Sequence, residues 1–181
     1  MMTTLKIDSS ITGEASVSRQ LTAATIDQLR AQHLDTQIVE RDLVATPLSH
    51  LTLGGSGDAD VLDEFLAAET VVIGAPMYNF TVPSQLKAWI DRILVAGKTF
   101  RYGANGPEGL AGDKRVIIAV SRGGFYDDGN AFEHAKSYLQ AAFEFIGITP
   151  EFVHADGIAV GPEQREAGIA KGLAEVERLA A

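Results

Sequence analysis

A serine-rich segment at residues 8–19 has the composition of a phosphate-binding site. Its possible donors are Ser9, Ser16, Ser18 and Arg19. The segment follows a short strand pattern and precedes a helical pattern that starts near Val17. Unpaired N–H groups at a helix start bind an anion together with uncharged hydroxyls, and Arg19 could supply a counter-charge. We interpret the segment as a phosphate site; the alternative is that Ser16 or Ser18 is only the helix N-cap.

A loop at residues 74–83 carries large apolar side chains where a ligand crevice is expected. The relevant residues are Pro76, Met77, Tyr78, Asn79 and Phe80. A β-branched run predicts a strand that ends at Gly74, and a helical pattern predicts a helix that starts near Ser84. Loops at the carboxyl ends of strands line ligand crevices in open α/β sheets, so this loop could hold a flat aromatic ligand. The alternative is that Met77 and Phe80 only cap the sheet.

Two glycines follow the most strand-like run of the chain, residues 116–120. The segment consists of Ser121, Arg122, Gly123 and Gly124. Glycine lets the backbone come close to a flat ligand and leaves N–H groups free to donate. We interpret the segment as another edge of the same crevice. A tight turn into the next helix is the alternative that needs no ligand.

Five strand patterns alternate with five helical patterns along the chain. Parallel strands need such crossover connections. We therefore expect an α/β fold in one domain spanning residues 1–181: a three-layer, doubly wound, parallel five-stranded sheet of flavodoxin-like type with strand order 2-1-3-4-5. In that order strands 1, 3 and 4 are neighbours, so the three segments meet at the switch point of the sheet.

Two further elements belong to this prediction. Residues 99–107 alternate apolar and polar side chains and end in a turn signal, so a small hairpin is expected, with Phe100 and Tyr102 near the crevice. The fourth helix is expected to include Phe132 at its start and to end at Gly147.

Composition excludes several classes of protein. The chain has 15 basic and 24 acidic residues, a net charge of −9, which does not suit sequence-independent binding of nucleic acid or membrane lipid. The absence of cysteine excludes thiolate chemistry and suits a reducing cytosol. No signal-peptide pattern or long apolar run is found, so a cytoplasmic protein is expected. The four histidines share no ligand spacing, and no metal site is expected.

A phosphorylated planar heterocycle fits the three segments together, and FMN fits best. The first loop lacks the three spaced glycines of the dinucleotide fingerprint, which disfavours a Rossmann site for NAD or FAD. Hydride chemistry would take place at flavin N5, so no catalytic side chain is expected.

The three segments, in this order, resemble those of the FMN-dependent NADH azoreductases, dimeric flavodoxin-like enzymes related to quinone reductases. The resemblance spans nearly the whole chain, and its most specific part is the Ala75-Pro76-Met77-Tyr78-Asn79-Phe80 motif. It implies cofactor contacts from Ser9, Ser16, Val17, Ser18, Pro76, Met77, Tyr78, Asn79, Phe80, Ser121, Arg122, Gly123 and Gly124. Candidates for the substrate-facing wall are Phe100, Tyr102, Phe125 and Tyr126. The segment between Asp42 and the second helix is shorter than in many members of that family.

The resemblance implies a homodimeric FMN-dependent NADH:quinone oxidoreductase and azoreductase. NADH or NADPH would reduce tightly bound FMN and leave, and a quinone, azo or nitroaromatic compound would then occupy the same place, which gives two-electron ping-pong kinetics. Backbone N–H groups near Asn79, Gly123 and Gly124 would bind flavin N5 and the pyrimidine edge. One alternative is a non-catalytic FMN electron carrier. Another is a binding or signalling domain without flavin, which would leave the serine loop unexplained.

Overall fold

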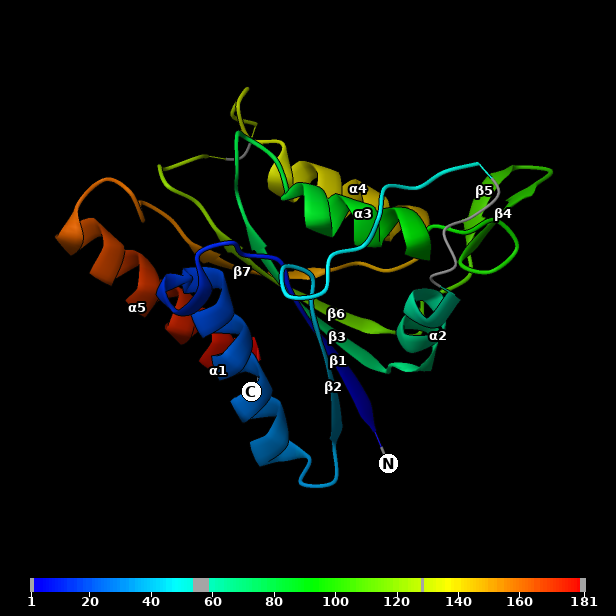
Figure 1. Ribbon diagram of the computed structural model, residues 1–181, viewed down its shortest axis with the longest axis horizontal. Helices are drawn as coiled ribbons and strands as arrows, with labels where there is room; N and C mark the ends of the chain where they lie inside the picture. The colour runs from blue at the N-terminus through cyan, green and yellow to red at the C-terminus, as the bar shows by residue number, and fades with distance from the viewer. Residues whose placement is uncertain (1, 54–58, 128, 180–181) are drawn as a thin grey trace.

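A parallel five-stranded sheet forms the centre of the computed structural model, which describes residues 2–53, 59–127 and 129–179 (Figure 1). In order across the sheet, its strands are β2 (Gln37–Asp42), β1 (Thr3–Asp8), β3 (Thr70–Pro76), β6 (Arg115–Ser121) and β7 (Glu151–Ala155). Neighbouring strands are parallel throughout. The central strand β3 is buried along its whole length, as its β-branched sequence requires when both faces of a sheet are covered.

The predicted α/β fold with a parallel five-stranded sheet is confirmed, and the observed strand order is consistent with the flavodoxin-like order. The numbering differs because a hairpin, β4 and β5, comes before β6 in the chain. The predicted end of the third strand at Gly74 is wrong by two residues. Pro76 still pairs with Ser121 of β6, and Met77 N–H donates to the Ser121 carbonyl, so the neighbouring strand prolongs β3.

Helices cover both faces of the sheet (Figure 1). One face carries α1 (Val17–Gln32), which follows the short 3-10 turn η1 (Gly13–Ala15), and α5 (Pro162–Leu179). The other face carries α2 (Ala59–Ala67), α3 (Ser84–Ile93) and α4 (Ala135–Phe145). The larger apolar core lies between the sheet and α2, α3 and α4, where Trp89 makes an edge contact with Phe65 at 6.0 Å between ring centroids. Apolar burial on both faces therefore fixes where the strand ends emerge.

The fourth helix begins later than predicted. Phe132 precedes α4 and is exposed, and its ring packs against Phe80 rather than into the core. The prediction that Phe132 belongs to this helix is wrong, because its ring packs against Phe80 in the loop after β3. The short segment after Asp42 includes residues 54–58, which lie outside the described residues. No helix in the described part of the chain combines the length and apolarity needed to cross a membrane.

The predicted hairpin exists as β4 (Phe100–Gly103) and β5 (Gly106–Gly109), but within one chain it does not lie near the crevice as expected. Phe100 packs against Phe145 at the carboxyl end of α4, with 4.7 Å between ring centroids. A Cβ at Gly109 would collide with the backbone of Gly147, so the hairpin is pressed onto the end of that helix. The ligand-side loops precede the amino ends of α3 and α4, so Phe100 and Tyr102 lie at the opposite ends of these helices (Figure 1).

Candidate functional site

The loops that follow β1, β3, β6 and β7 surround a groove of about 510 Å³. This volume is within the range of small-molecule and cofactor sites. The groove is lined by Ser10, Thr12, Ala15, Ser16, Val17, Pro76, Met77, Tyr78, Ser121, Arg122, Gly123, Ile158, Ala159 and Arg165. The structure therefore brings the three predicted segments together at one edge of the sheet.

The start of α1 forms one end of the groove. Ser16 is the N-cap, and its Oγ accepts a hydrogen bond from Arg19 N at 3.2 Å and lies 3.1 Å from Ser18 Oγ. Within the described chain, the first-turn N–H groups of Val17 and Ser18 donate to no other residue. The helix dipole and these N–H groups favour an anion here. Ser16 therefore caps the helix, as the N-cap interpretation predicts. The helix start nevertheless keeps N–H donors that can bind an anion.

The serines of the first loop have different surroundings from those expected. Ser9 is fully buried, and its hydroxyl donates to the Gly74 carbonyl at 2.6 Å, so it stabilises the β1–β3 edge and does not line the groove. Ser18 is also fully buried beneath the helix start. Ser10 and Thr12 line the groove instead, with 3.0 Å between their hydroxyl oxygens. Ser10 stands next to the predicted serine, and two adjacent serines beyond the end of β1 give no sequence signal that tells which of them faces the groove.

Tyr78 connects the loop after β1 with the loop after β3. Its hydroxyl lies 3.1 Å from Ser10 Oγ and accepts a hydrogen bond from Ile11 N at 3.2 Å. Tyr78 also lines a neighbouring cavity of about 580 Å³, which contains Asn79, Lys87 and Tyr138. Burial raises the pKa of Tyr138 to about 12, so this phenol stays protonated at neutral pH. Met77 and Tyr78 thus face the groove, whereas Asn79 belongs to the adjoining cavity.

The turn from Tyr78 to Thr81 holds strained backbone. The two residues exchange backbone hydrogen bonds of 2.9 and 3.1 Å around Asn79 and Phe80, whose φ angles are +47° and +72°. Asparagine tolerates this region, but phenylalanine is disfavoured there by roughly 1–3 kcal/mol. The Phe80 carbonyl accepts a hydrogen bond from His134 N, so the segment before α4 holds the turn in place. Phe80 does not line the groove; its half-exposed ring lies 5.4 Å from that of Phe132, measured between centroids.

The glycine loop after β6 is bound to the loop after β7. Gly123 and Gly124 accept hydrogen bonds through their carbonyls from Ala159 N and Gly157 N. Their own N–H groups have no partner among the described residues. Ile158 and Ala159 therefore border the groove, although the sequence interpretation left them out. The expected strand order could have indicated them, because it already places strand 5 beside strand 4.

The other predicted wall residues do not line the groove. Phe125 is mostly exposed and packs over Gly157, and Tyr126 lies under the Arg122 guanidinium at 5.8 Å from the ring centroid. A Cβ added at Gly124 would lie 3.4 Å from the same Tyr126 ring. No cluster of three or more metal-ligating side chains occurs among the residues that the structure describes.

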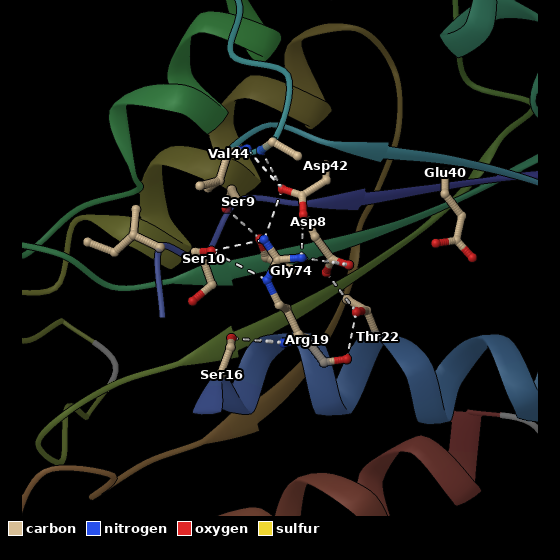
Figure 2. Close-up of polar contacts among 12 residues, drawn as sticks. Asp8, Ser9, Ser10, Ser16, Arg19, Thr22, Glu40, Asp42, Val44 and Gly74 are labelled. Carbon is tan, nitrogen blue, oxygen red and sulfur yellow. Dashed lines mark hydrogen bonds and ion pairs between the residues drawn. The ribbon is translucent and has the colours of Figure 1, made fainter. Parts of the chain in front are cut away.

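Arg19 extends away from the groove, contrary to its interpretation as the counter-charge for a phosphate. It makes a bidentate contact with Asp42, at 2.8 and 2.9 Å, and donates to the Ser10 carbonyl (Figure 2). The hydrogen bonds from Arg19, together with those from the N–H groups of Val44 and Ala45, lower the pKa of Asp42 to about 2. Arg19 of α1 thus connects β2 to the loop that follows β1, on the side of that loop that faces away from the groove.

Comparison with known proteins agrees with the fold described above. Residues 2–180 match a family described as having a flavodoxin-like fold. The chain is 56% identical to an FMN-dependent NADH:quinone oxidoreductase 2 from Bradyrhizobium diazoefficiens, across 99% of this chain and 100% of the relative. It is 49% identical to an FMN-dependent NADH:quinone oxidoreductase from Xanthomonas campestris pv. campestris, across 98% and 99%.

Solved structures show the same similarity. An azoreductase from Bacillus anthracis str. Sterne superposes with a TM-score of 0.89 at 32% identity, covering 99% of both chains. The azoreductase AzrA superposes with a TM-score of 0.88 at 33% identity, covering 98% of both chains.

Proposed function

Because the chain belongs to this family of flavodoxin-like fold, we propose that it is an FMN-dependent NADH:quinone oxidoreductase that also reduces azo compounds. The observation that carries the proposal is the groove itself, which has a helix start at one end and unpaired glycine N–H groups at another edge. A relative with this name is 56% identical over 99% of the chain. An enzyme is thus favoured over a non-catalytic carrier, and NADH is the donor that these names specify.

The residues present fit FMN. Ser10, Thr12, Ser16 and the N–H groups of Val17 and Ser18 would hold the phosphate and ribityl chain at the start of α1. Met77 and Tyr78 would contact the ring system, and Gly123 and Gly124 would donate N–H hydrogen bonds to its polar edge. Ser9 would act indirectly, since its hydroxyl is bound to the sheet.

The protein's part in the reaction is binding, orientation and electrostatics. FMN, when bound, would accept a hydride from NADH and pass it to the acceptor. The N–H groups of Gly123 and Gly124 are fixed by the neighbouring loop, so they would favour negative charge at the polar edge of the ring without rearrangement. Donor and acceptor would occupy the same open side in turn, which would give ping-pong kinetics. Nitroaromatic compounds belong to the same proposed class of planar acceptors.

The position of Phe100 and Tyr102 supports a homodimer. The family resemblance assigns both residues to the substrate wall, yet in one chain they lie at the far end of α3 and α4 from the groove. Tyr102 is 75% exposed on its hairpin. A second copy that brings its hairpin to the groove would satisfy both observations, and sedimentation at several protein concentrations measures this assembly. We further propose one domain over residues 1–181 and a cytoplasmic location, which the lack of cysteine supports.

One experiment tests the function directly. The purified chain is denatured, and the released cofactor is compared with FMN, FAD and riboflavin. The FMN-loaded protein is then assayed with NADH and with NADPH, using one quinone and one azo dye as acceptors. We expect FMN, steady oxidation of NADH and parallel double-reciprocal lines. Flavin binding without NADH oxidation would identify a carrier, and a chain that stays colourless with added FMN would reject the proposal.

A further inference from the structure

We propose that Arg165 on α5 provides the positive charge that binds the FMN phosphate, and that it thereby makes the site select phosphorylated flavin over riboflavin. This inference rests on the proposed function, because it concerns the same groove. It replaces the expectation that Arg19 has this role.

The charges along the groove are few and of one sign. Among the residues that line it, only Arg122 and Arg165 are charged, and no Asp or Glu is present in this lining. The whole chain has a net charge of −9, so a phosphate dianion is repelled at long range and needs a local cation. The arginine that binds the phosphate must therefore be one whose charge is not already offset by a carboxylate.

Two of the three nearby arginines are already neutralised. Arg122 is buried and makes a bidentate ion pair with Asp156, at 2.6 and 2.9 Å. Arg19 makes the corresponding contact with Asp42 and lies behind the loop (Figure 2). Paired guanidinium groups have less net charge for a ligand, because each bidentate carboxylate offsets it.

Arg165 has a different environment. No carboxylate of the described chain lies within ion-pair distance of its guanidinium. Its Nη2 donates to the Ala15 carbonyl at 3.0 Å, and this is its one side-chain hydrogen bond in the described structure. A guanidinium has five N–H donors, so most of them stay available for phosphate oxygens.

The bond to Ala15 places this charge next to the helix start. Ala15 directly precedes the N-cap Ser16, and both residues line the groove with Arg165. The guanidinium therefore adds to the N–H groups and the dipole of α1 at the same end of the groove. Riboflavin has the ring and the ribityl chain but no phosphate, so it would not use this contact.

The test compares two ligands on the apo-protein. Fluorescence quenching gives the Kd of FMN and of riboflavin for the wild-type chain and for Arg165→Gln. We expect the FMN Kd to rise by about 10- to 100-fold, since a charge-assisted contact is lost, and the riboflavin Kd to change by less than about twofold. Arg165→Lys should recover part of the FMN affinity because it restores the charge without the planar fork.

A matched control comes from the same helix. Arg178→Gln removes one positive charge from the last turn of α5, far from the groove, and should leave both Kd values unchanged. Thermal melting of each apo-variant shows whether the fold is intact.

Two results would overturn the assignment. If Arg165→Gln weakens FMN and riboflavin equally, the residue only supports the loop through Ala15. If FMN affinity is unchanged, the phosphate uses other groups. A wild-type chain that binds neither flavin would overturn the proposed function itself, and with it the role of Arg165 toward FMN.

Discussion

At the start of α1 the polar groups of the groove are buried and bound to one another, whereas around the turn at residues 78–81 aromatic rings are exposed and the backbone is strained. Ser10 and Ser16 are 1% and 5% exposed, while Phe80 and Phe132 are 48% and 60% exposed. The first region, which we call the tail end, suits a group of fixed shape and charge. The second region, the ring end, lies beside the groove, which it joins through Tyr78, and it leaves apolar surface open for planar molecules that bind and leave.

The same contrast appears in what holds each region. The tail end is held by short-range polar contacts, such as the Ser16 cap, and by the Arg19–Asp42 ion pair behind it. The ring end depends on the neighbouring segment, since His134 N–H holds the carbonyl of the strained Phe80. Strain of this kind persists only where surrounding structure enforces it. Changes at the tail end should therefore act on cofactor affinity, and changes at the ring end on the acceptor.

The largest effect is expected from Ser16→Asp. Aspartate is as good an N-cap as serine, so α1 should form normally. Its carboxylate would face the phosphate at the tail end, and a unit charge about 4 Å from a dianion is repelled by several kcal/mol at an effective dielectric constant of about 20. FMN affinity of the apo-protein should fall by about 100-fold or more, measured by fluorescence titration.

Ser16→Ala separates the cap from the charge. It should lower the free energy of unfolding by about 1 kcal/mol and weaken FMN only several-fold. If Ser16→Asp binds FMN as well as the wild-type chain does, the phosphate does not lie at the start of α1, and the comparison between the two ends fails.

The next effect concerns the ion pair behind the tail end. Arg19→Gln removes the bidentate contact with Asp42 and the bond to the Ser10 carbonyl. We expect unfolding in urea to become easier by about 2 kcal/mol and FMN affinity to fall several-fold, because the loop is less well fixed. The matched control is Arg41→Gln, which breaks comparable contacts of the neighbouring β2 residue with Glu64 and Asp60 of α2, on the opposite face of the sheet from α1. It should lower stability without changing flavin affinity; equal effects of both variants on FMN would contradict the link between Arg19 and the groove.

The difference between the two ends also explains what the sequence could predict. Strand and helix patterns depend on local periodicity, so they predicted the sheet, the helix start at Val17 and the meeting of three loops. The choice of partner for a long side chain depends on distances in the folded chain. Arg165 contacts a carbonyl 150 positions away, and Arg19 contacts a carboxylate 23 positions away. No local pattern separates their roles.

The hairpin is a different case, because simple geometry could have corrected it. The ten residues of α3 span about 15 Å, which carries the chain away from the crevice before Phe100 is reached. The hairpin pattern placed Phe100 and Tyr102 near the crevice, and the family resemblance supported their place in the substrate wall. A site completed by a second copy of the chain would reconcile that assignment with the fold. Local sequence patterns do not predict contacts between two copies.

A smaller effect is expected at the ring end. Phe80→Gly relieves the φ angle of +72° but removes the ring contact with Phe132. Since relief of strain is opposed by the greater freedom of glycine in the unfolded state, stability should change by less than about 1 kcal/mol. The KM for a bulky azo dye should rise several-fold, while the FMN Kd stays constant. Phe132→Ala, which keeps the strained turn, should raise the same KM; an altered FMN Kd in either variant would show that the two ends are not separate.

The smallest effect is a pH dependence at the tail end. The folded pKa of Asp42, about 2, lies below its ordinary value of 3.8, because Arg19 and two backbone N–H groups bind the charged form. A carboxyl with a depressed folded pKa contributes stability that is complete above about pH 4 and is lost as the pH falls toward 2. The Asp42 side chain is 37% exposed, so screening limits this contribution to about 1 kcal/mol. Asp42→Asn cannot titrate, so the difference in unfolding free energy between wild type and variant should be largest at pH 6 and smaller at pH 3 in urea titrations. A difference that stays constant over this range would mean that the Arg19–Asp42 contact holds the loop by shape rather than by charge.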